Sequence, residues 1–439
     1  MKTLRKGSAI AVVAAAALAL GACSKGTSTS ESTTDSETTE KVEISYVHRL
    51  PNADGVDALV KKWNEENPNI QVKAEKFPGE AKDFMPQLKQ NVADGTAACL
   101  AQVGYAELPN AFVDGILEDV TAHVTDADKE TYKGTIDLMK IGESFYGIPQ
   151  DNGPLVYLYD KAAFEALGLT VPTTAAEFIE TAKKAAAAGK YIVSYQTDEI
   201  GNMFGGLAAA AGGAWYGGDT EGFTVNVLDK GTEALADFWQ QILDAKAASV
   251  VARWDATQFD AAIKEGKLIG TFAAGWEAGL IPDLVFGINK DNVQDGTWAA
   301  ALLPDFGAGQ LSGPDGGSGV AVVKGCAHPA EAMKFNSWFN DQVDALAGEQ
   351  GLVPASTTPA ATPEFVKKFY GGQDVYELLA EANGKMAPVA FIPGWSEVTT
   401  AMVTTGADVT SGAKKVIDIF KAADETSKTV LEKGGFTVK

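Results

Sequence analysis

The stretch YGIPQDNGPLVYLY, residues 146–159, decides the fold of this chain. Its second half contains Leu155 to Leu158, a short apolar run typical of a buried strand. Its first half places an aromatic residue, glycines and prolines beside the polar run Gln150-Asp151-Asn152. Aromatic, small and carboxylate residues that gather next to a strand mark a candidate binding segment, because ligands of α/β proteins bind where strands end.

Two later stretches have the same character. One is GTFAAGWE, residues 270–277, and the other is GGSGVAVVKGCAHP, residues 316–329. Residues 319–323 of the second stretch are small or Val, which predicts a strand. The three stretches together predict a site assembled from distant parts of the chain.

The first part of the folded chain predicts a βαβ unit. Residues 42–47 alternate apolar and polar, as do residues 70–74, which is typical of strands. Between them, Val56, Val60 and Trp63 lie on one face of a helix. Strand, helix and strand within about 35 residues favour a parallel pair. A third strand is expected at residues 99–103.

The rest of the chain continues the alternation of helices and strands. Thr174 and Glu177 have the spacing of a capping box at the start of a helix. We expect a strand at 192–195, a long helix after Pro329 and mostly helix over 397–431. The sequence contains no internal repeat of solenoid period. The predicted fold class is therefore α/β.

In this order, the motifs closely resemble those of a known family. The matching segments are the Tyr-Gly-Ile-Pro stretch at 146–149, Val171-Pro172-Thr173-Thr174, the loop Gly275-Trp276 and the Gly-Gly-Ser-Gly strand at 316–319. This pattern is similar to that of the maltose-binding-protein-like extracellular solute-binding proteins of bacterial ABC-type carbohydrate importers. The resemblance runs from Val42 to the C-terminus. One departure is Gly275-Trp276, where the family often has Gly-Pro-Trp.

The resemblance implies two α/β lobes joined by hinge crossovers, with a sugar bound in the cleft between them. The expected crossovers are near residues 151–153, 313–317 and 352–355. Glycines at the middle crossover suit a hinge, because they absorb backbone rotation at low cost. The expected bounds are 42–151 with 318–352 for lobe 1, and 152–313 with 355–439 for lobe 2.

Aromatic residues are expected to stack on the sugar, because a pyranose has an apolar C–H face that matches an indole or phenol ring. Trp276 is the leading candidate, since it matches the family's aromatic residue in the Gly-x-Trp loop. Trp215, Tyr216 and Trp395 lie next to glycines and are further candidates. By contrast, Trp63, Trp239 and Trp338 lie on or beside apolar helix faces and are expected in the core. The sequence leaves Trp254 and Trp298 open.

Polar residues at strand ends are expected to bond the sugar hydroxyls. Asp151 and Asn152 lie on the first crossover, where the family often has ligand contacts. His48 and Arg49 end the first strand, although a lone histidine is equally well interpreted as structural. The other predicted ligand-binding residues are Tyr105, Glu107, Glu277 and Gly317.

The cysteines and histidines of the folded part predict no metal site. Cys99 and Cys326, with the histidines at 48, 123 and 328, have none of the spacings of zinc ligands. No cofactor is expected. In the family's strand order, Cys99 and Cys326 lie on antiparallel neighbours, and this implies a Cys99–Cys326 disulfide, which is compatible with export from the cell.

The N-terminus is typical of an exported protein. The cations Lys2, Arg5 and Lys6 precede an apolar run that is too short to span a bilayer. The run ends in Leu20-Gly21-Ala22-Cys23, which resembles the lipobox of bacterial lipoproteins. We therefore expect a signal peptide at 1–22, lipidation of Cys23 and a Ser/Thr-rich disordered tether at 23–41. The protein would be lipid-anchored at the extracellular face of the cell membrane.

Composition limits the partners. The chain has 439 residues and a formal net charge of −22, and removal of the three signal cations makes the charge −25. A chain this acidic, with no basic stripe, is a poor ligand for nucleic acid. Its length favours two lobes, and we expect a monomer.

The sequence thus predicts a non-catalytic receptor that captures an oligosaccharide and delivers it to an ABC transporter permease. The alternatives are an extracellular glycoside hydrolase, which needs a carboxylate pair, and a surface carbohydrate adhesin. No GxSxG motif or P-loop is present. The segments at 48–51 and 104–107 are similar to those of oligosaccharide receptors of gut actinobacteria, including those for α-1,6-galactosides.

Overall fold

The computed structural model describes residues 41–79, 81–219 and 222–439 and has a mixed α/β fold. The predicted signal peptide, Cys23 and all of the predicted tether except Lys41 lie outside the described residues. The strands are β1 (Val42–His48), β2 (Ile70–Lys76), β3 (Leu100–Gly104), β4 (Lys140–Ile141), β5 (Ser144–Phe145), β6 (Gly147–Asp160), β7 (Ser194–Gln196), β8 (Tyr216–Asp219), β9 (Gly222–Val225), β10 (Ser249–Val251), β11 (Gly270–Ala274), β12 (Trp298–Ala301) and β13 (Pro314–Val322). The α-helices are α1 (Ala53–Glu66), α2 (Ala81–Asp94), α3 (Leu108–Val113), α4 (Asp126–Thr131), α5 (Lys161–Ala166), α6 (Ala175–Ala187), α7 (Ile200–Ala210), α8 (Lys230–Asp244), α9 (Phe259–Lys264), α10 (Glu277–Phe286), α11 (Pro329–Asn340), α12 (Val343–Gln350), α13 (Glu364–Phe369), α14 (Val375–Gly384), α15 (Trp395–Thr410) and α16 (Val416–Lys433). Two 3₁₀ helices cover Thr121–His123 and Ile136–Met139.

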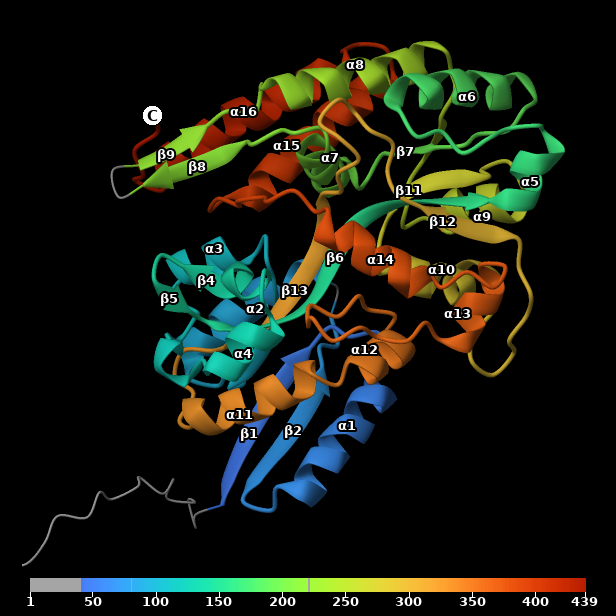
Figure 1. The fold of residues 1–439 in the computed structure, drawn as a ribbon. Helices are drawn as coiled ribbons and strands as arrows, with labels where there is room; N and C mark the ends of the chain where they lie inside the picture. The colour runs from blue at the N-terminus through green and yellow to red at the C-terminus, as the bar shows by residue number, and fades with distance from the viewer. Residues whose placement is uncertain (1–40, 80, 220–221) are drawn as a thin grey trace, which may run out of the picture. The chain divides into compact units, whose positions relative to one another are not determined.

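The stretch at residues 146–159 forms most of the central strand β6. The main sheet has seven strands in the order β11-β6-β13-β3-β1-β2, with β12 also paired to β6. The first half of β6 pairs antiparallel with β13, and its second half pairs antiparallel with β11 and β12. β6 therefore belongs to both halves of the sheet, and β13 runs beside its first half through the middle of Figure 1.

A third segment joins these strands where the crossovers are expected. The backbone N–H of Asn152 donates to Val353 at 2.8 Å, and the N–H of Ala355 donates to Gln150 at 3.0 Å. Asp151 and Pro354 form an isolated antiparallel bridge. Residues near 151–153, 313–317 and 352–355 thus lie close together, as hinge crossovers require.

The hydrophobic core divides on either side of these crossovers. Two clusters take their buried residues from 44–148 and 320–355, and we name this part lobe 1. Two other clusters take theirs from 155–306 and 347–431, and we name this part lobe 2. This division supports the predicted lobe bounds, which stay a prediction.

Local sequence signals position the strands and helices of both lobes. The predicted βαβ unit is confirmed, since β1 and β2 are parallel from Val42 opposite Ile70 to His48 opposite Lys76. Between them, the Asn52 side chain accepts from the Gly55 N–H and caps α1. The capping box of α6 is also confirmed, with Thr174 and Glu177 each bonding the other's backbone N–H.

Three expected elements have different bounds in the structure. The strand expected at 192–195 is β7, Ser194–Gln196. The long helix expected after Pro329 is interrupted between Asn340 and Val343, which gives α11 and α12. The helical C-terminus is interrupted near Gly412, whose φ of +80° leaves the helical region, and it forms α15 and α16.

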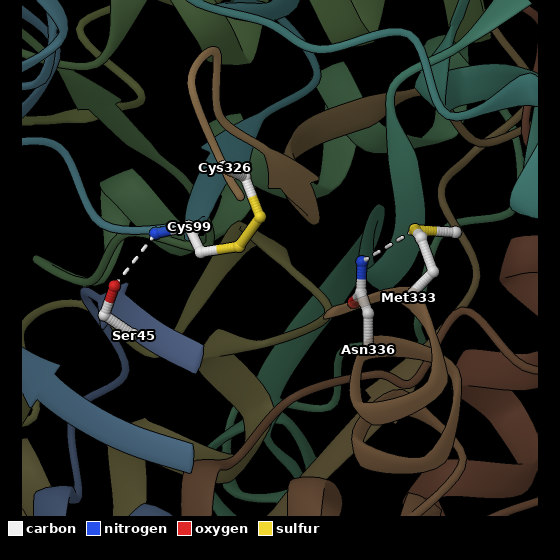
Figure 2. The surroundings of a disulfide bond; sticks show 5 residues. All are labelled: Ser45, Cys99, Cys326, Met333 and Asn336. Atoms are coloured by element: carbon white, nitrogen blue, oxygen red, sulfur yellow. Dashed lines mark hydrogen bonds between the residues drawn. A yellow bond between two sulfur atoms is a disulfide. The ribbon is translucent and has the colours of Figure 1, made fainter. Parts of the chain in front are cut away.

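Cys99 and Cys326 form a disulfide in lobe 1 (Figure 2). The two residues flank the antiparallel pair β3 and β13, and their Cα atoms lie 4.6 Å apart. The N–H of Cys99 donates to Ser45 Oγ at 3.0 Å, which ties the bridge to β1. The disulfide closes 227 residues of sequence separation, so it links the start of lobe 1 to its return segment.

None of the helices in the described part of the chain is long and apolar enough to cross a membrane.

Candidate functional site

A cleft of about 940 Å³ lies where lobe 1, lobe 2 and the crossover strands meet. This volume is within the range of small-molecule sites. Both lobes contribute side chains, as do β13 and the segment before α15. The predicted ligand-binding residues that line the cleft are Arg49, Glu107, Asp151, Trp215, Tyr216, Trp276, Gly317 and Trp395.

Two predicted site residues lie in the core of lobe 1 rather than on the cleft. His48 is 1% exposed, because the alternation of β1 puts it on the same buried face as Ile44 and Tyr46. Burial, with Lys76 nearby, lowers the pKa of His48 to about 4, so the ring is neutral. Tyr105 is also buried, and its ring packs against Gly317.

Two more predicted residues lie behind the cleft lining. The Asn152 side chain is 1% exposed, and neither end of its amide has a hydrogen-bond partner among the described residues. Glu277 is buried in an ion pair with Arg253 and accepts from the Ala274 N–H at 3.0 Å. Their positions do not favour direct ligand contact, although Glu277 fixes the loop before Trp276.

Trp276 is the half-buried aromatic residue that faces the cleft at the end of β11. Its indole Nε1–H donates to the backbone oxygen of Asp315 at 3.0 Å. The Trp254 ring stacks parallel to it, with centroids 6.0 Å apart and planes 4° apart. The Nε1–H of Trp254 in turn donates to the Glu199 carboxylate. These contacts fix the orientation of the Trp276 ring.

The other predicted stackers form a second aromatic group. The ring centroid of Trp395 lies 6.2 Å from those of Trp215 and Tyr216. Trp215 and Trp395 are 8% and 6% exposed and belong to the lobe 2 core. The glycines on both sides of Trp215 therefore do not keep its ring out of the core. Both rings are core residues with an edge on the cleft.

The polar residues on the lobe 1 side form a connected network, which we name the lobe 1 wall. Arg49 makes two hydrogen bonds to Glu107, at 2.9 and 2.7 Å. The Gln102 amide accepts from the Arg49 N–H at 2.7 Å and donates to Ser318 Oγ at 3.1 Å. The Ser318 hydroxyl donates to Asp151. These five residues are Arg49, Gln102, Glu107, Asp151 and Ser318.

Burial raises the pKa of Asp151 to about 6. The hydrogen bonds from Ser318 and the positive charge of Arg49 act in the opposite direction and lower it. The carboxyl is 5% exposed and lines the cleft. Asp151 is therefore a hydrogen-bonding group whose charge changes in the mildly acidic range.

The opposite side is mainly aromatic, and we name it the lobe 2 wall: Glu199, Trp215, Tyr216, Trp276 and Trp395. The Glu199 side chain lies close to the acids Asp198 and Glu277, and burial together with these charges raises its pKa. Asp315, at the start of β13, lies beside this wall and is 7% exposed.

Glycines at the middle crossover allow close approach of the backbone. Gly316 and Gly317 have φ angles of +77° and +92°, which side-chain-bearing residues rarely adopt. A Cβ on Gly317 would lie 2.9 Å from the Tyr105 ring, and one on Gly316 would lie 3.2 Å from Trp276 Nε1. The Gly-Gly pair is thus required by the geometry of the site.

The prediction from sequence missed several cleft residues. Asp315 lies inside the crossover expected at 313–317, so the sequence could have indicated that it lies near the ligand. Glu199 and Asn202 follow β7, at the strand end where ligands of α/β proteins bind. Asn110 and Phe391 gave no signal in the sequence, because only the folded chain brings their segments together.

The described residues contain no group of three or more His, Cys, Asp or Glu side chains placed to hold a metal ion. Two of the acids in and behind the cleft are instead partners of arginines: Glu107 pairs with Arg49, and Glu277 pairs with Arg253. In chemical terms, the cleft therefore offers flat apolar rings on one wall and hydrogen-bonding groups on the other.

Comparison with known proteins identifies relatives of the same architecture. Residues 51–342 match the family model of the bacterial extracellular solute-binding proteins. The galacto-N-biose-/lacto-N-biose I-binding protein of the ABC transporter from Bifidobacterium longum, solved with lacto-N-biose, is 48% identical. The alignment covers 92% of this chain and 100% of that one, with a TM-score of 0.85.

Two more distant structures share the fold. The ABC transporter associated binding protein from B. animalis subsp. lactis, in complex with β-1,6-galactobiose, is 22% identical over 91% of this chain and 100% of its own, with a TM-score of 0.74. The sugar-binding protein MalE from Xanthomonas citri is 16% identical over 89% and 98%, with a TM-score of 0.73.

A search of curated proteins found no match. The family model and the solved relatives describe substrate-binding proteins, not enzymes. They confirm the expected two-lobed α/β fold and the resemblance found in the sequence. This chain belongs to the bacterial extracellular solute-binding proteins.

Proposed function

We propose that this protein captures a short oligosaccharide in the cleft between its lobes and delivers it to the permease of an ABC transporter. The observation that carries this proposal is the pairing of the Trp276 ring with the polar lobe 1 wall across one cleft. A pyranose has an apolar face and a rim of hydroxyls, and these two surfaces match the two walls.

The energies of such contacts are sufficient for micromolar binding of the sugar. A micromolar dissociation constant corresponds to about 8.2 kcal/mol. Hydrogen bonds to charged groups contribute about 1.5–3 kcal/mol each, and an aromatic contact adds roughly 0.5–1.5 kcal/mol beyond its buried area. Two ring contacts and three charge-assisted bonds therefore reach this value and offset part of the cost of ordering the ligand.

The ligand proposed is a galactose-containing disaccharide of the lacto-N-biose type. The support is the relative from B. longum, which was solved with lacto-N-biose and is 48% identical over 92% of this chain. The α-1,6-galactosides, suggested by the sequence segments at 48–51 and 104–107, remain a second class to test.

Ligand binding is proposed to favour a closed arrangement of the lobes, which the permease then recognises. A ligand drives closure only through its greater affinity for the closed state. Gly316 and Gly317 supply the backbone freedom at the middle crossover. Contacts to both walls exist together only when the lobes are close, so a ligand held by both walls favours closure.

The N-terminal segment supports the location of this activity. Removal of the predicted signal at 1–22 would leave Cys23 as a lipidated first residue, with the Ser/Thr-rich tether carrying the folded part as a monomer. Lipid attachment is tested by labelling cells with a radioactive fatty acid and comparing the chain with its Cys23→Ala variant. Labelling of both forms, or of neither, would contradict the anchor.

Calorimetry with a panel of oligosaccharides tests the function. We expect micromolar or tighter binding of lacto-N-biose and weaker binding of glucose-based disaccharides. Analysis of the same mixtures for hydrolysis products tests the hydrolase alternative, and we expect none. Small-angle scattering with and without the bound sugar tests the adhesin alternative, since an adhesin has no reason to become more compact.

A further inference from the structure

Among the described residues, none donates a hydrogen bond to the buried carboxyl of Asp315. It lies at the start of β13, on the middle crossover, and it lines the cleft while being only 7% exposed. Within residues 41–79, 81–219 and 222–439, its backbone oxygen accepts from Trp276, but no donor reaches its side chain. Buried carboxylates are normally paired, so an unpaired one on a cleft needs an explanation.

The nearby charges do not satisfy Asp315. Glu199 and Glu277 are both negative, and together with burial they raise the pKa of Asp315. Arg253 acts in the opposite direction, but its guanidinium is already ion-paired with Glu277 and lies between the rings of Trp254 and Phe259, 4.8 and 4.2 Å from their centroids. The carboxylate of Asp315 therefore stays available to a donor that enters the cleft.

The position of Asp315 relative to Trp276 is fixed. The indole Nε1–H bonds the backbone oxygen of Asp315 at 3.0 Å. Gly316, the next residue, lies so close to that indole nitrogen that a Cβ would be 3.2 Å from it. The backbone of Asp315 is thus held next to the edge of the ring on which a sugar would stack, and its side chain lines the same cleft. Equatorial hydroxyls of a pyranose point outward from the rim of the sugar ring, so a group beside the indole is in a position to meet them.

We propose that Asp315 is a ligand-binding residue whose carboxylate accepts hydrogen bonds from hydroxyl groups of the sugar ring that stacks on Trp276. This inference rests on the proposed function and adds a specificity-determining residue to the same cleft. The unpaired acceptor selects sugars that carry hydroxyls at the edge of the stacked ring. An analogue without the correct hydroxyl leaves the buried carboxylate unpaired and binds poorly.

The test compares Asp315→Asn with the unchanged full chain, with lacto-N-biose as the probe in calorimetry. The amide keeps the shape of the side chain but removes its charge and one acceptor oxygen. We expect at least a tenfold loss of affinity. The melting temperature of the ligand-free variant should be equal to or higher than that of the unchanged chain, because the amide removes an acid that burial and the negative charges of Glu199 and Glu277 disfavour. Asp126→Asn, which changes an exposed acid of α4, is the matched control and should bind normally.

Monodeoxy analogues of lacto-N-biose identify the hydroxyl. On the unchanged chain, at least one analogue should bind ten times more weakly than lacto-N-biose. On Asp315→Asn, the same analogue and lacto-N-biose should bind about equally well. Equal affinity of Asp315→Asn and the unchanged chain for the probe, or a lower melting temperature of the ligand-free variant, overturns the role of Asp315 and leaves the receptor function intact. Failure of the unchanged chain to bind any oligosaccharide in the panel overturns the proposed function itself.

Discussion

The two walls of the cleft use their residues in opposite ways. On the lobe 1 wall, Arg49, Glu107, Gln102, Ser318 and Asp151 are connected by hydrogen bonds before any ligand enters. On the lobe 2 wall, Trp276 presents a flat ring, and the neighbouring Asp315 carboxylate has no donor among the described residues. One wall is satisfied internally, and the other is incomplete without a ligand.

This difference indicates how affinity is divided between the walls. A group that is already hydrogen-bonded gains little when it exchanges one partner for another, so the lobe 1 wall mainly provides a rigid, preorganised surface. The Trp276 ring and the Asp315 carboxylate gain more. The ligand removes apolar surface of the ring from water and supplies a donor to the carboxylate. We therefore expect larger losses of affinity from changes on the lobe 2 side.

The largest expected effect concerns the stability of lobe 1 rather than binding. The Cys99–Cys326 disulfide closes a very long loop, and removal of such a bond costs about 2–5 kcal/mol of unfolding free energy. The double change Cys99→Ala, Cys326→Ala should lower stability by this amount in denaturant titrations. Affinity for lacto-N-biose at 25 °C should stay within twofold, because neither cysteine lines the cleft.

The bond itself is tested by titration of free thiols in the unreduced, denatured chain. Cys23→Ala leaves Cys99 and Cys326 as the two remaining cysteines. We expect no reactive thiol in this variant. Two reactive thiols would show that Cys99 and Cys326 are not bonded to each other.

The largest effect on binding is expected at Trp276. Trp276→Ala should weaken sugar binding at least about tenfold, or 1.4 kcal/mol, because the stacking surface is lost. The ligand-free melting temperature should change little, since the ring is only half-buried. The control is Trp63→Ala in lobe 1, whose ring is 5% exposed and packs 5.3 Å from Trp338. That variant should melt earlier and bind normally, whereas a Trp276→Ala variant that binds normally or fails to fold would remove Trp276 from the site.

Acid should weaken the contribution of the lobe 1 wall. The pKa of Asp151 is about 6, with Arg49 as the nearby charge, and only the ionised carboxylate is a full acceptor for sugar hydroxyls. Affinity should therefore fall between pH 7 and pH 5, by at most about tenfold, which is the fall in the ionised fraction of Asp151. Ligand-free stability should change in the other direction. The folded state binds the proton more tightly than the unfolded state does, so stability rises as the pH falls from about 6 to about 4.

Asp151→Asn separates this titration from that of other acids. Its affinity should be lower at pH 7 and should depend less on pH, with Asp315 and Glu199 responsible for what remains, because their pKa values are also raised. An unchanged pH profile in Asp151→Asn would show that Asp151 does not control binding.

Much of the fold could be predicted from short-range signals. The alternation of β1, the capping box of α6 and the apolar run from Leu155 to Leu158 each depend on residues close in sequence, and each is confirmed, although β6 already begins at Gly147. The division of the helix after Pro329 was missed, because apolar spacing continues from Phe339 to Val343 and Leu346 across the interruption. Periodicity alone does not detect such a turn.

The site could be predicted only in part, because its chemistry depends on which segments meet. The position of His48 could have been corrected from the sequence, since the two-residue period that predicts β1 also places His48 on the buried face with Tyr46. For Trp215, the surrounding glycines indicated a loop but not that the ring packs into the core. The importance of Asp315 depends on a missing partner, and a sequence does not show which partners are missing.

The smallest effect is expected where the two lobes touch. The N–H of Gly394, before α15, donates to Asn110 of α3 at 2.8 Å, and Phe391 packs against the cores of both lobes. Asn110→Ala should weaken lacto-N-biose binding about twofold to tenfold, since one hydrogen bond contributes roughly 0.5–1.5 kcal/mol. The loss should be in the dissociation rate, which stopped-flow fluorescence measures, because the bond holds the lobes together after the ligand has entered.

Asn64→Ala is the matched control for this contact. Asn64 also accepts from a backbone N–H, that of Val72 at 2.7 Å, but both residues lie in lobe 1. This variant should lose stability without a change in dissociation rate. If the two variants dissociate from the sugar equally fast, the contact between Asn110 and Gly394 does not hold the cleft closed. The two lobes would then be joined across the cleft by the ligand and the crossover strands alone.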